Sequence, residues 1–503
     1  MHPNLLMKLN KKSLLIEKKK DNESGINKTS DKWFIRTGLL VLFSLHILLY
    51  NLGPNFTDLQ SRKYTTGLAF NNAKKFVYFY YNDHLFPLTL KELPDEMECS
   101  ETNSSQLIEE RGNDLIMEYK HWSRMGEHAR IFVFLPDALI EGPCKPSVKL
   151  FNSLCFLIAI LALFYSLTKA GYPVLALIMS LAFSLTPFYM YEVYRNKNIF
   201  TLLAVVFIFG TSLNLKFLLK NDRNKWDFLI PVASGLIISF FNEIRGEIKV
   251  VLFSVLALYL LSQKLSWIVR VLYMLLLLSS FVGTKQVLRH YFDRKFEQTA
   301  EVVKKAGGHV YTGDRSGSHT FWHPVFCGLG DFDTKYGYKW EDRVAYTYAI
   351  PVLQSKYHIN LPYSGKYHFD AWYDKDSLYY IKFEEFPEYE EIMKDKVLSD
   401  IKQDPLWFLS ILAKRAERIL NKTLPFPWAG WFVFPLTGIL WWKRNWFLIK
   451  LILISLPLSL TPLMIYSGGN STFNSVFPLI TVSIILWMVF ERLRVGDWQH
   501  LDT

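Results

Sequence analysis

The sequence predicts an all-α polytopic membrane protein with about ten transmembrane helices and two extracytoplasmic loops. Half of the 503 residues are hydrophobic and 16% are aromatic. Apolar runs of about 20 residues recur along the chain, which is the length that a helix needs to cross a bilayer. Because lipid offers no hydrogen bonds to a peptide backbone, these runs are predicted to be helical. Two long polar segments, 53–149 and 284–423, interrupt them.

The individual spans follow from where the apolar runs begin and end. Most of them carry no charge near their centre, and Arg270 is the main exception. The fifth run is short and Pro187 lies near the end of the third, so the number of spans is approximate. The predicted spans are 36–52, 150–168, 172–190, 198–216, 227–241, 248–263, 266–283, 424–441, 446–464 and 474–491.

Positive charges predict the orientation of these spans. The tail 1–32 is polar, rich in lysine and predicted to be disordered, and alternate turns between spans are also basic. By the positive-inside rule, this tail and the tail 492–503 are cytoplasmic and both long polar segments are extracytoplasmic. The first span follows too long a polar tail for a cleaved signal peptide and is predicted to be a retained anchor. The net charge of +11 is therefore explained by the orientation of the chain in a bilayer, which we expect to be a bacterial inner membrane. We expect no nucleic-acid partner.

The polar segments divide the chain into units. Residues 33–283 hold the first seven spans together with the first outer loop, 53–149. Residues 284–423 combine charged, glycine-rich and aromatic stretches with a last helix at about 388–420, which predicts a small domain of α and irregular structure. Residues 424–491 hold the last three spans.

The four cysteines leave the disulfide pattern open. Cys99 and Cys144 share the first outer loop, which allows a disulfide in an oxidising compartment. Cys327 lies in the second outer segment and could instead form a disulfide with either Cys99 or Cys144. Cys155 lies inside a predicted helix, where cysteine is usually a small packing residue.

Asp58 follows the first predicted span and lies at the outer membrane surface. A carboxylate at this place could act as the general base on an acceptor hydroxyl. The alternative is a solvated loop acid or a helix N-cap. Sequence alone leaves both interpretations open.

Short outer turns after the third and fifth spans carry cations that the positive-inside rule does not predict. They include Arg195, beside Glu192, and Arg245, beside Glu243 and Glu247. A guanidinium can bind a phosphate through two parallel hydrogen bonds. The same residues could instead form structural ion pairs with their neighbouring carboxylates.

The segment 307–342 concentrates histidine, aspartate, glycine and aromatic residues. Pro324 follows His323 and disfavours helical geometry there, which weakens a metal site built on His319 and His323, four residues apart. A sugar-binding rim and a tightly packed loop are the other interpretations. Substrate binding is assigned to Glu192, His319, Trp322, His323, Asp331 and Asp333, and a divalent metal could use His319, His323, Asp331 and Asp333.

A basic patch precedes the eighth span, at Lys414, Arg415 and Arg418. Basic side chains at a membrane surface can hold a lipid phosphate. They also complement the negative end of a helix. Both interpretations remain open.

The layout resembles that of the GT-C superfamily of polytopic glycosyltransferases, which includes protein O-mannosyltransferases and lipid A aminoarabinose transferases. Local support comes from an acid after the first span, a charged turn after the third, and an Asp-Pro stretch leading into a later helix. The residues concerned are Asp58 with Tyr64 and Ala69, Glu192 with Arg195, and Asp404 with Pro405 and Arg415.

This resemblance implies sugar transfer from a polyprenyl-phosphate donor to a glycan, lipid or protein acceptor on the outer face. Asp58 would be the catalytic base, and Arg195, Arg245 and Arg415 would hold the donor phosphate. No cofactor is required in this interpretation.

Two other classes of protein remain. A non-enzymatic transporter or envelope-assembly subunit would share the polytopic layout, although a transporter typically carries charges or broken helices near the middle of the membrane. A metal-dependent hydrolase or transferase on the outer face would use the metal ligands named above.

Overall fold

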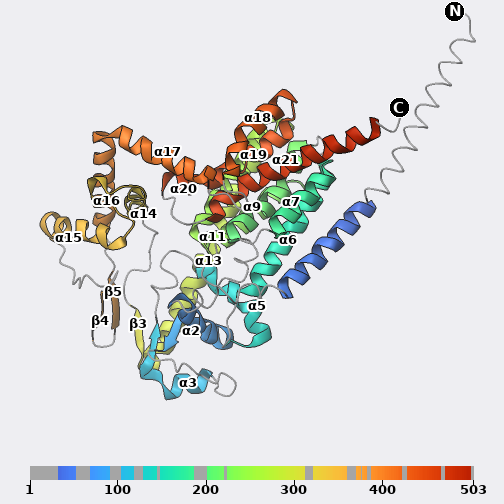
Figure 1. Ribbon diagram of the computed structural model, residues 1–503. Helices are drawn as coiled ribbons and strands as arrows, with labels where there is room; N and C mark the ends of the chain where they lie inside the picture. The colour runs from blue at the N-terminus through green and yellow to red at the C-terminus, as the bar shows by residue number, and fades with distance from the viewer. Residues whose placement is uncertain are drawn as a thin grey trace, which may run out of the picture.

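The computed structural model is mostly helical (Figure 1). It describes residues 32–51, 68–90, 104–117, 128–143, 148–185, 201–219, 224–311, 321–358, 370–374, 377–381, 387–421, 428–465 and 471–499. Among these residues, four helices are long and apolar enough to cross a membrane. They are Lys32–Asn51, α6 (Lys149–Lys169), α13 (Trp267–Lys305) and the stretch Trp446–Met464. A helical, membrane-embedded protein is thereby confirmed in outline.

Shorter apolar helices occupy other predicted spans. They include α7 (Pro173–Leu185), α9 (Thr201–Asn214), α11 (Leu229–Asn242), α12 (Val250–Leu261) and α18 (Val433–Trp442). The stretch Trp446–Met464 is itself divided into α19 (Trp446–Leu453), a 3-10 turn and α20 (Leu460–Met464), and α21 (Ser471–Gln499) is the last described helix. Because several of these helices are shorter than a bilayer is thick, ten crossings stay a prediction.

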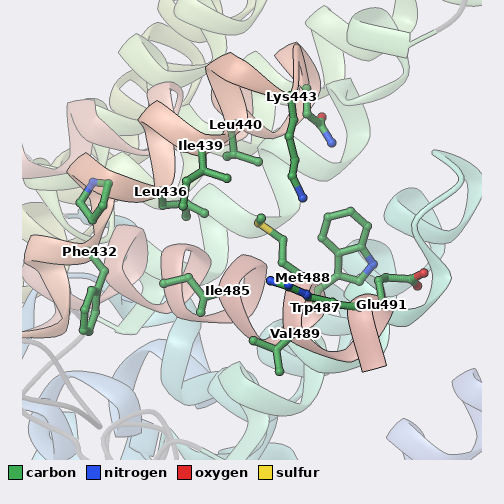
Figure 2. Close-up of a pocket in the computed structure, with 13 residues that line it drawn as sticks. Phe432, Leu436, Ile439, Leu440, Lys443, Ile485, Trp487, Met488, Val489 and Glu491 are labelled. Carbon is green, nitrogen blue, oxygen red and sulfur yellow. The ribbon is translucent and has the colours of Figure 1, made fainter. Parts of the chain in front are cut away.

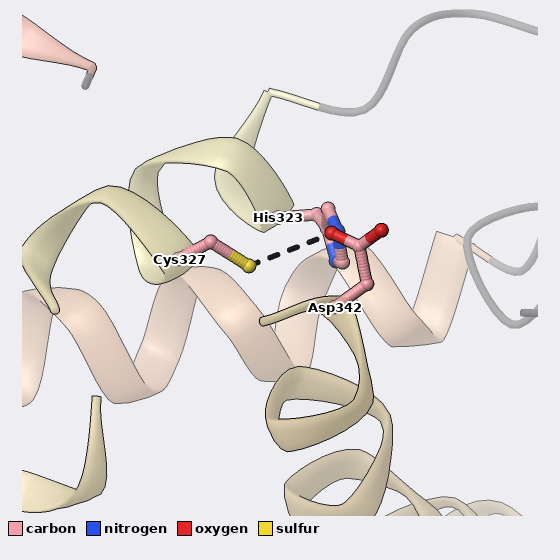
Figure 3. Close-up of side chains that lie close together, drawn as sticks. All are labelled: His323, Cys327 and Asp342. Carbon is pink, nitrogen blue, oxygen red and sulfur yellow. Dashed lines mark hydrogen bonds and ion pairs between the residues drawn. The ribbon is translucent and has the colours of Figure 1, made fainter. Parts of the chain in front are cut away.

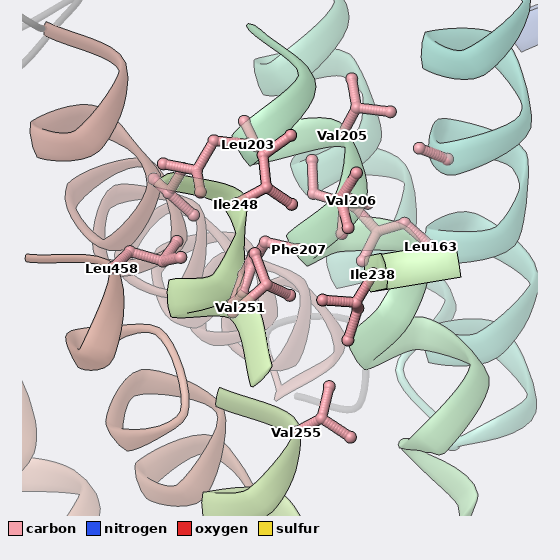
Figure 4. Packing of buried hydrophobic residues seen from close by; sticks show 14 of the residues in the cluster. Leu163, Leu203, Val205, Val206, Phe207, Ile238, Ile248, Val251, Val255 and Leu458 are labelled. Atoms are coloured by element: carbon pink, nitrogen blue, oxygen red, sulfur yellow. The ribbon is translucent and has the colours of Figure 1, made fainter. Parts of the chain in front are cut away.

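Apolar side chains fill the space between the bundle helices. Val206, Phe207, Ile238 and Val251 are almost completely buried there (Figure 4). α11 approaches α13 closely at Gly235, where a Cβ atom would lie 2.5 Å from the carbonyl oxygen of Leu277. Small residues commonly permit such close contacts between membrane helices.

α13 joins the bundle to the second outer segment without a break. Its 39 residues correspond to about 58 Å at 1.5 Å per residue, well beyond the roughly 30 Å of a hydrocarbon core. The predicted seventh span ends at residue 283 and the second outer segment is predicted to begin at 284, but in the structure the helix continues through this point. Thr284 donates a hydrogen bond from Oγ1 to Ser280 O at 2.7 Å, which fits an unbroken helix.

A mixed five-stranded sheet lies outside the bundle, and the all-α prediction missed it. Its order is β1-β2-β3-β5-β4, with the outer pairs antiparallel and the two central pairs parallel. The strands are β1 (Leu88–Leu90), β2 (Leu115–Met117), β3 (His309–Tyr311), β4 (Asp370–Asp374) and β5 (Ser377–Ile381). Three-residue strands are too short to show the alternating pattern by which strands are recognised.

This sheet unites the two outer segments. β2 of the first segment pairs with β3 of the second, with Ile116 opposite His309. Side chains from both segments share a small apolar core that includes Leu88, Leu115, Phe296 and Val303. The helices of the first segment are α2 (Leu68–Asp83), α3 (Ser104–Glu110) and α5 (Ile131–Glu141). The first loop and the start of the second are therefore one structural unit.

The rest of the second segment forms a helical unit with its own apolar core. It consists of α14 (Trp322–Leu329), α15 (Asp342–Tyr357), α16 (Pro387–Gln403) and α17 (Pro405–Asn421), and Figure 1 shows α17 leading back to the bundle. The sequence predicted one helix over 388–420. The structure divides it at Asp404, whose Oδ1 accepts a hydrogen bond from Trp407 N at 3.0 Å. An acidic cap followed by proline begins a new helix, because proline needs no backbone donor at the first position.

Candidate functional site

Charged side chains from three parts of the chain meet at the end of the bundle that faces the sheet. One group comes from a 3-10 turn, His128–Arg130, and a second from the turn after α11, where Gly246–Lys249 forms another 3-10 helix. The third comes from α13 beyond the predicted span. The backbone links the first two, since Ala129 N donates to Glu243 O at 3.0 Å. We call these residues the cationic cluster, which consists of His128, Arg130, Glu243, Arg245, Glu247, Lys249, Lys285 and Arg289.

Arg245 is oriented by a local ion pair within the cationic cluster. Its Nε lies 2.6 Å from Glu247 Oε2, and its Nη2 donates to Glu247 Oε1 at 2.8 Å. Both side chains are largely buried, at 23% and 16% exposure. Of the two interpretations that the sequence left open for Arg245, the ion pair is therefore present, and phosphate binding stays a prediction.

Burial shifts the pKa of both Arg130 and Glu243. Burial lowers the pKa of Arg130 to about 10, with the charge of Arg245 adding to this effect and that of Glu247 opposing it. Arg130 therefore remains a cation at neutral pH. Glu243 is 1% exposed, and burial raises its pKa although Lys285 and Arg289 on α13 act in the opposite direction.

His128 is the neutral member of the cationic cluster. Burial lowers its pKa to about 4, and the nearby charge of Arg289 lowers it further. Its ring packs against Phe292 with the centroids 5.3 Å apart. A neutral imidazole at this position adds no positive charge to a region that already contains several cations.

The cationic cluster holds more cations than carboxylates. Among the described groups that the contacts and electrostatic interactions above connect, the carboxylates are Glu243 and Glu247. The cations are Arg130, Arg245, Lys249, Lys285 and Arg289. Arg130, Arg245 and Lys285 are half-buried, whereas Lys249 and Arg289 are exposed. A surplus of positive charge at such a place attracts anions, including phosphate.

Aromatic side chains form a wall beside the cationic cluster. Phe132 of α5 stacks on Phe240 of α11 with centroids 6.0 Å apart and planes at 15°. Phe132 also contacts Tyr291 on α13, whose hydroxyl lies 2.7 Å from that of Tyr80. A charged group therefore adjoins an apolar surface, as an amphiphilic ligand requires.

A second constellation lies in the helical unit, at His323, Cys327 and Asp342 (Figure 3). His323 and Cys327 are four residues apart on α14, with Nε2 and Sγ separated by 3.8 Å. Asp342, the first residue of α15, places Oδ1 3.1 Å from the same Nε2. Burial raises the pKa of the Cys327 thiol to about 12, and the charge of Asp342 contributes.

α16 holds α14 in place beside this constellation. The Glu390 carboxylate accepts hydrogen bonds from the backbone N–H groups of Phe321, Trp322 and His323 at 3.0–3.3 Å. Such a carboxylate satisfies the free donors at a helix N-terminus. Pro324 lies in the first turn, where a helix tolerates proline, so His323 is helical despite the expectation from the sequence.

The other residues that the sequence singled out are placed separately. Asp331 pairs with Arg415, with Oδ2 3.4 Å from Nε. Asp333 accepts hydrogen bonds from Lys335 N and from Trp407 Nε1. Their carboxylates therefore have protein partners, and His323 is joined by Cys327 and Asp342 instead. Asp58, Cys99, Cys144, Glu192, Arg195 and His319 lie outside the described residues.

The sequence indicated Glu243, Arg245 and Glu247 of the cationic cluster and His323 of the second constellation, but not the other members. The i, i+4 spacing of His323 and Cys327 is the sequence signal that could have identified Cys327. Arg130, Lys285 and Arg289 carried no distinguishing local pattern. Their proximity follows from packing between segments that are far apart in sequence.

A groove of about 920 Å³ lies between α18 and the second half of α21 (Figure 2). Its walls are apolar, with Leu436 and Ile485 among the lining residues. Lys443, Glu491 and Arg492 line one end of it.

Comparison of the chain with protein-family models, curated proteins and solved structures finds no match.

Proposed function

We propose that the protein is a membrane glycosyltransferase that moves a sugar from a polyprenyl-phosphate donor to an acceptor hydroxyl on the outer face of a bacterial inner membrane. The surplus of cations in the cationic cluster carries this proposal, because it provides a place for a lipid phosphate at the end of the helical bundle. The aromatic wall around Phe132 offers an adjoining surface for the polyprenyl chain. The acceptor is a glycan, a lipid or a protein.

The cations act on the leaving group. When the bond between the sugar C1 and the phosphate oxygen breaks, the electron pair remains on the phosphate. Arg130, Lys285 and Arg289 stabilise the negative charge that develops on this phosphate. Because these cations are already in place, they lower the energy of the transition state without having to reorganise. The guanidinium of Arg245 is already paired with the Glu247 carboxylate. Arg245 therefore contributes positive charge at a distance and holds the turn after α11 in place.

The acceptor supplies the nucleophile. A carboxylate takes the proton of its hydroxyl as the oxygen bonds to C1 on the face opposite the phosphate, which inverts the sugar. Asp58 is the predicted base, and it belongs to the same outer segment as β2. Because β2 pairs with β3, residues of both outer segments can contribute to one acceptor site.

The test is a profile of glycans and lipid-linked sugars in a strain that lacks the protein. Complementing genes would encode the wild type, Asp58→Asn, Arg289→Gln or Arg294→Gln. Arg294 is the matched control, because it is exposed on the same helix as Arg289 and points to a different side.

We expect the deletion strain to accumulate a polyprenyl-phosphate sugar and to lack one sugar in a glycan, lipid or protein. Wild type and Arg294→Gln should restore the profile, whereas Asp58→Asn and Arg289→Gln should not. An unchanged profile in the deletion strain would overturn the proposal and favour a transporter or an assembly subunit. Rescue by Arg289→Gln as complete as that by wild type would remove the cationic cluster from the mechanism.

A further inference from the structure

We infer that His323, Cys327 and Asp342 bind a divalent cation of the zinc class. The three residues offer one imidazole nitrogen, one thiol sulfur and one carboxylate oxygen, all within 4.8 Å of one another. Nitrogen, sulfur and oxygen together are the ligand types that zinc accepts in proteins. The inference concerns binding in the helical unit and does not depend on the proposed sugar transfer.

The spacing of the ligand atoms suits a tetrahedral ion. Bond lengths of about 2.0–2.3 Å place two ligands of one tetrahedral zinc about 3.3–3.6 Å apart. His323 Nε2 lies 3.1 Å from Asp342 Oδ1 and 3.8 Å from Cys327 Sγ. Shifts of a few tenths of an ångström would therefore bring each of these two pairs to the tetrahedral spacing, and the third pair, Cys327 Sγ with an Asp342 carboxylate oxygen, lies within 4.8 Å.

Neighbouring groups already orient the histidine for this role. The Tyr389 hydroxyl lies 2.6 Å from His323 Nδ1, and the ring of Tyr346 stacks on the imidazole with centroids 5.5 Å apart. A metal-bound histidine usually donates its other ring N–H to an oxygen, which fixes both the tautomer and the ring. Tyr389 supplies that oxygen and leaves Nε2 facing Cys327 and Asp342.

The constellation is both enclosed and accessible. The His323 side chain is 9% exposed and Cys327 is buried, whereas the Asp342 side chain is 47% exposed. A cation can therefore arrive from the side of Asp342, and water can fill the fourth position. Binding releases the thiol proton of Cys327 to solvent. A divalent ion with one thiolate and one carboxylate is then neutral overall, which favours its partly buried position.

The bound ion would connect α14 to α15, which both pack against α16. His323 and Cys327 belong to α14 and Asp342 begins α15, and both helices pack against α16. The ion is expected to fix the start of α15 relative to α14. Metal binding should accordingly stabilise the helical unit.

The test uses the full chain purified in detergent and stripped with a chelator. Zn²⁺ content is measured by mass spectrometry after reloading, and Co²⁺ is added as a spectroscopic probe of thiolate coordination. Cys327→Ser and Asp342→Asn remove ligands. Cys155→Ser is the matched control, because Cys155 is the other described cysteine and lies in α6.

We expect about one equivalent of Zn²⁺ and a thiolate-to-cobalt charge-transfer band in the wild type and in Cys155→Ser. Cys327→Ser should lose the band, and Asp342→Asn should weaken binding at least tenfold. Tyr389→Phe keeps all three ligands and should weaken binding by roughly 10-fold through the orientation of His323. A melting curve of each variant is recorded with and without metal. A variant that still melts cooperatively without metal is folded, so its failure to bind metal is a loss of binding and not of folding. Absence of stoichiometric metal from the wild type, or a cobalt band that persists in Cys327→Ser, would overturn the inference.

Discussion

Phe86 and Thr299 connect the two outer segments through a single hydroxyl group. Phe86 N donates a hydrogen bond to Thr299 Oγ1 at 2.8 Å, and this hydroxyl lies 3.0 Å from Phe86 O. Thr299 is completely buried on α13. The long helix therefore holds the peptide of the first segment just before β1.

Replacement of Thr299 by valine keeps the shape of the side chain and removes the hydroxyl. The buried N–H of Phe86 then loses its partner, and we expect the outer unit to lose about 1–3 kcal/mol of stability. Denaturation followed by limited proteolysis measures this loss. Thr347→Val on the exposed face of α15 is the control, and equal effects of both substitutions would contradict the structural role of Thr299.

The buried pair Asp331–Arg415 predicts a strongly non-additive pair of substitutions. Arg415 is 0% exposed, and its Nη1 also donates to Leu463 O at 3.1 Å. Arg415→Met leaves the Asp331 carboxylate buried without its cation, so we expect a loss of about 3–5 kcal/mol. The double variant with Asp331→Asn should lose clearly less than the sum of the single effects.

Chemical denaturation of the single and double variants measures this coupling. Lys414→Met is the control, because Lys414 is exposed one position before Arg415. Additive losses at Asp331 and Arg415 would show that the pair contributes no coupling. Unaltered stability of Arg415→Met would contradict the burial of its charge.

His128 predicts a loss of stability in mild acid. Its pKa is lowered from 6.5 to about 4 in the folded protein, so the unfolded chain takes up the proton first as the pH falls. The stabilisation is complete above pH 6.5 and disappears as the pH approaches 4, amounting to about 3 kcal/mol. His128→Gln should lose less stability than the wild type over this interval. Melting curves at several pH values measure the difference, and parallel curves for both proteins would contradict the prediction.

The cationic cluster predicts salt-dependent binding of a polyprenyl phosphate. Removal of one charge-assisted contact by Arg289→Gln should weaken binding about tenfold, because such contacts contribute about 1.5–3 kcal/mol. Arg294→Gln should bind as the wild type does. Titration of the lipid into protein held in nanodiscs, at low and high salt, measures both affinities. Equal affinity of Arg289→Gln and the wild type would place the phosphate elsewhere.

The helices were the most predictable part of this chain. Apolar runs report directly on helical spans, and each described bundle helix falls on a predicted run. The strands β1, β2 and β3 were not predictable, because each has three residues and the pairing of β2 with β3 depends on long-range contacts. The division at Asp404 was visible in the Asp-Pro pair, but the surrounding helical composition concealed it.

Only part of each constellation was recognisable in the sequence. Arg245 was conspicuous because a cation in a short outer turn opposes the usual charge distribution, and His323 was conspicuous in a segment rich in glycine. Their partners could not be identified in the same way. Arg130 approaches Arg245 because the backbone of Ala129 bonds to Glu243, and no local pattern reports such a contact.

The parallel pairing of β2 with β3 has a consequence for biogenesis. β2 is synthesised before all the helices from α5 to α13, and β3 follows the last of them. A parallel partner cannot be supplied by a neighbouring hairpin, so the edge of β2 that pairs with β3 stays open while the intervening helices are synthesised. β3 can pair with β2 only after α13 has been synthesised, and β4 and β5 follow still later in the chain. The sheet is therefore one of the last parts of this structure to be completed during synthesis.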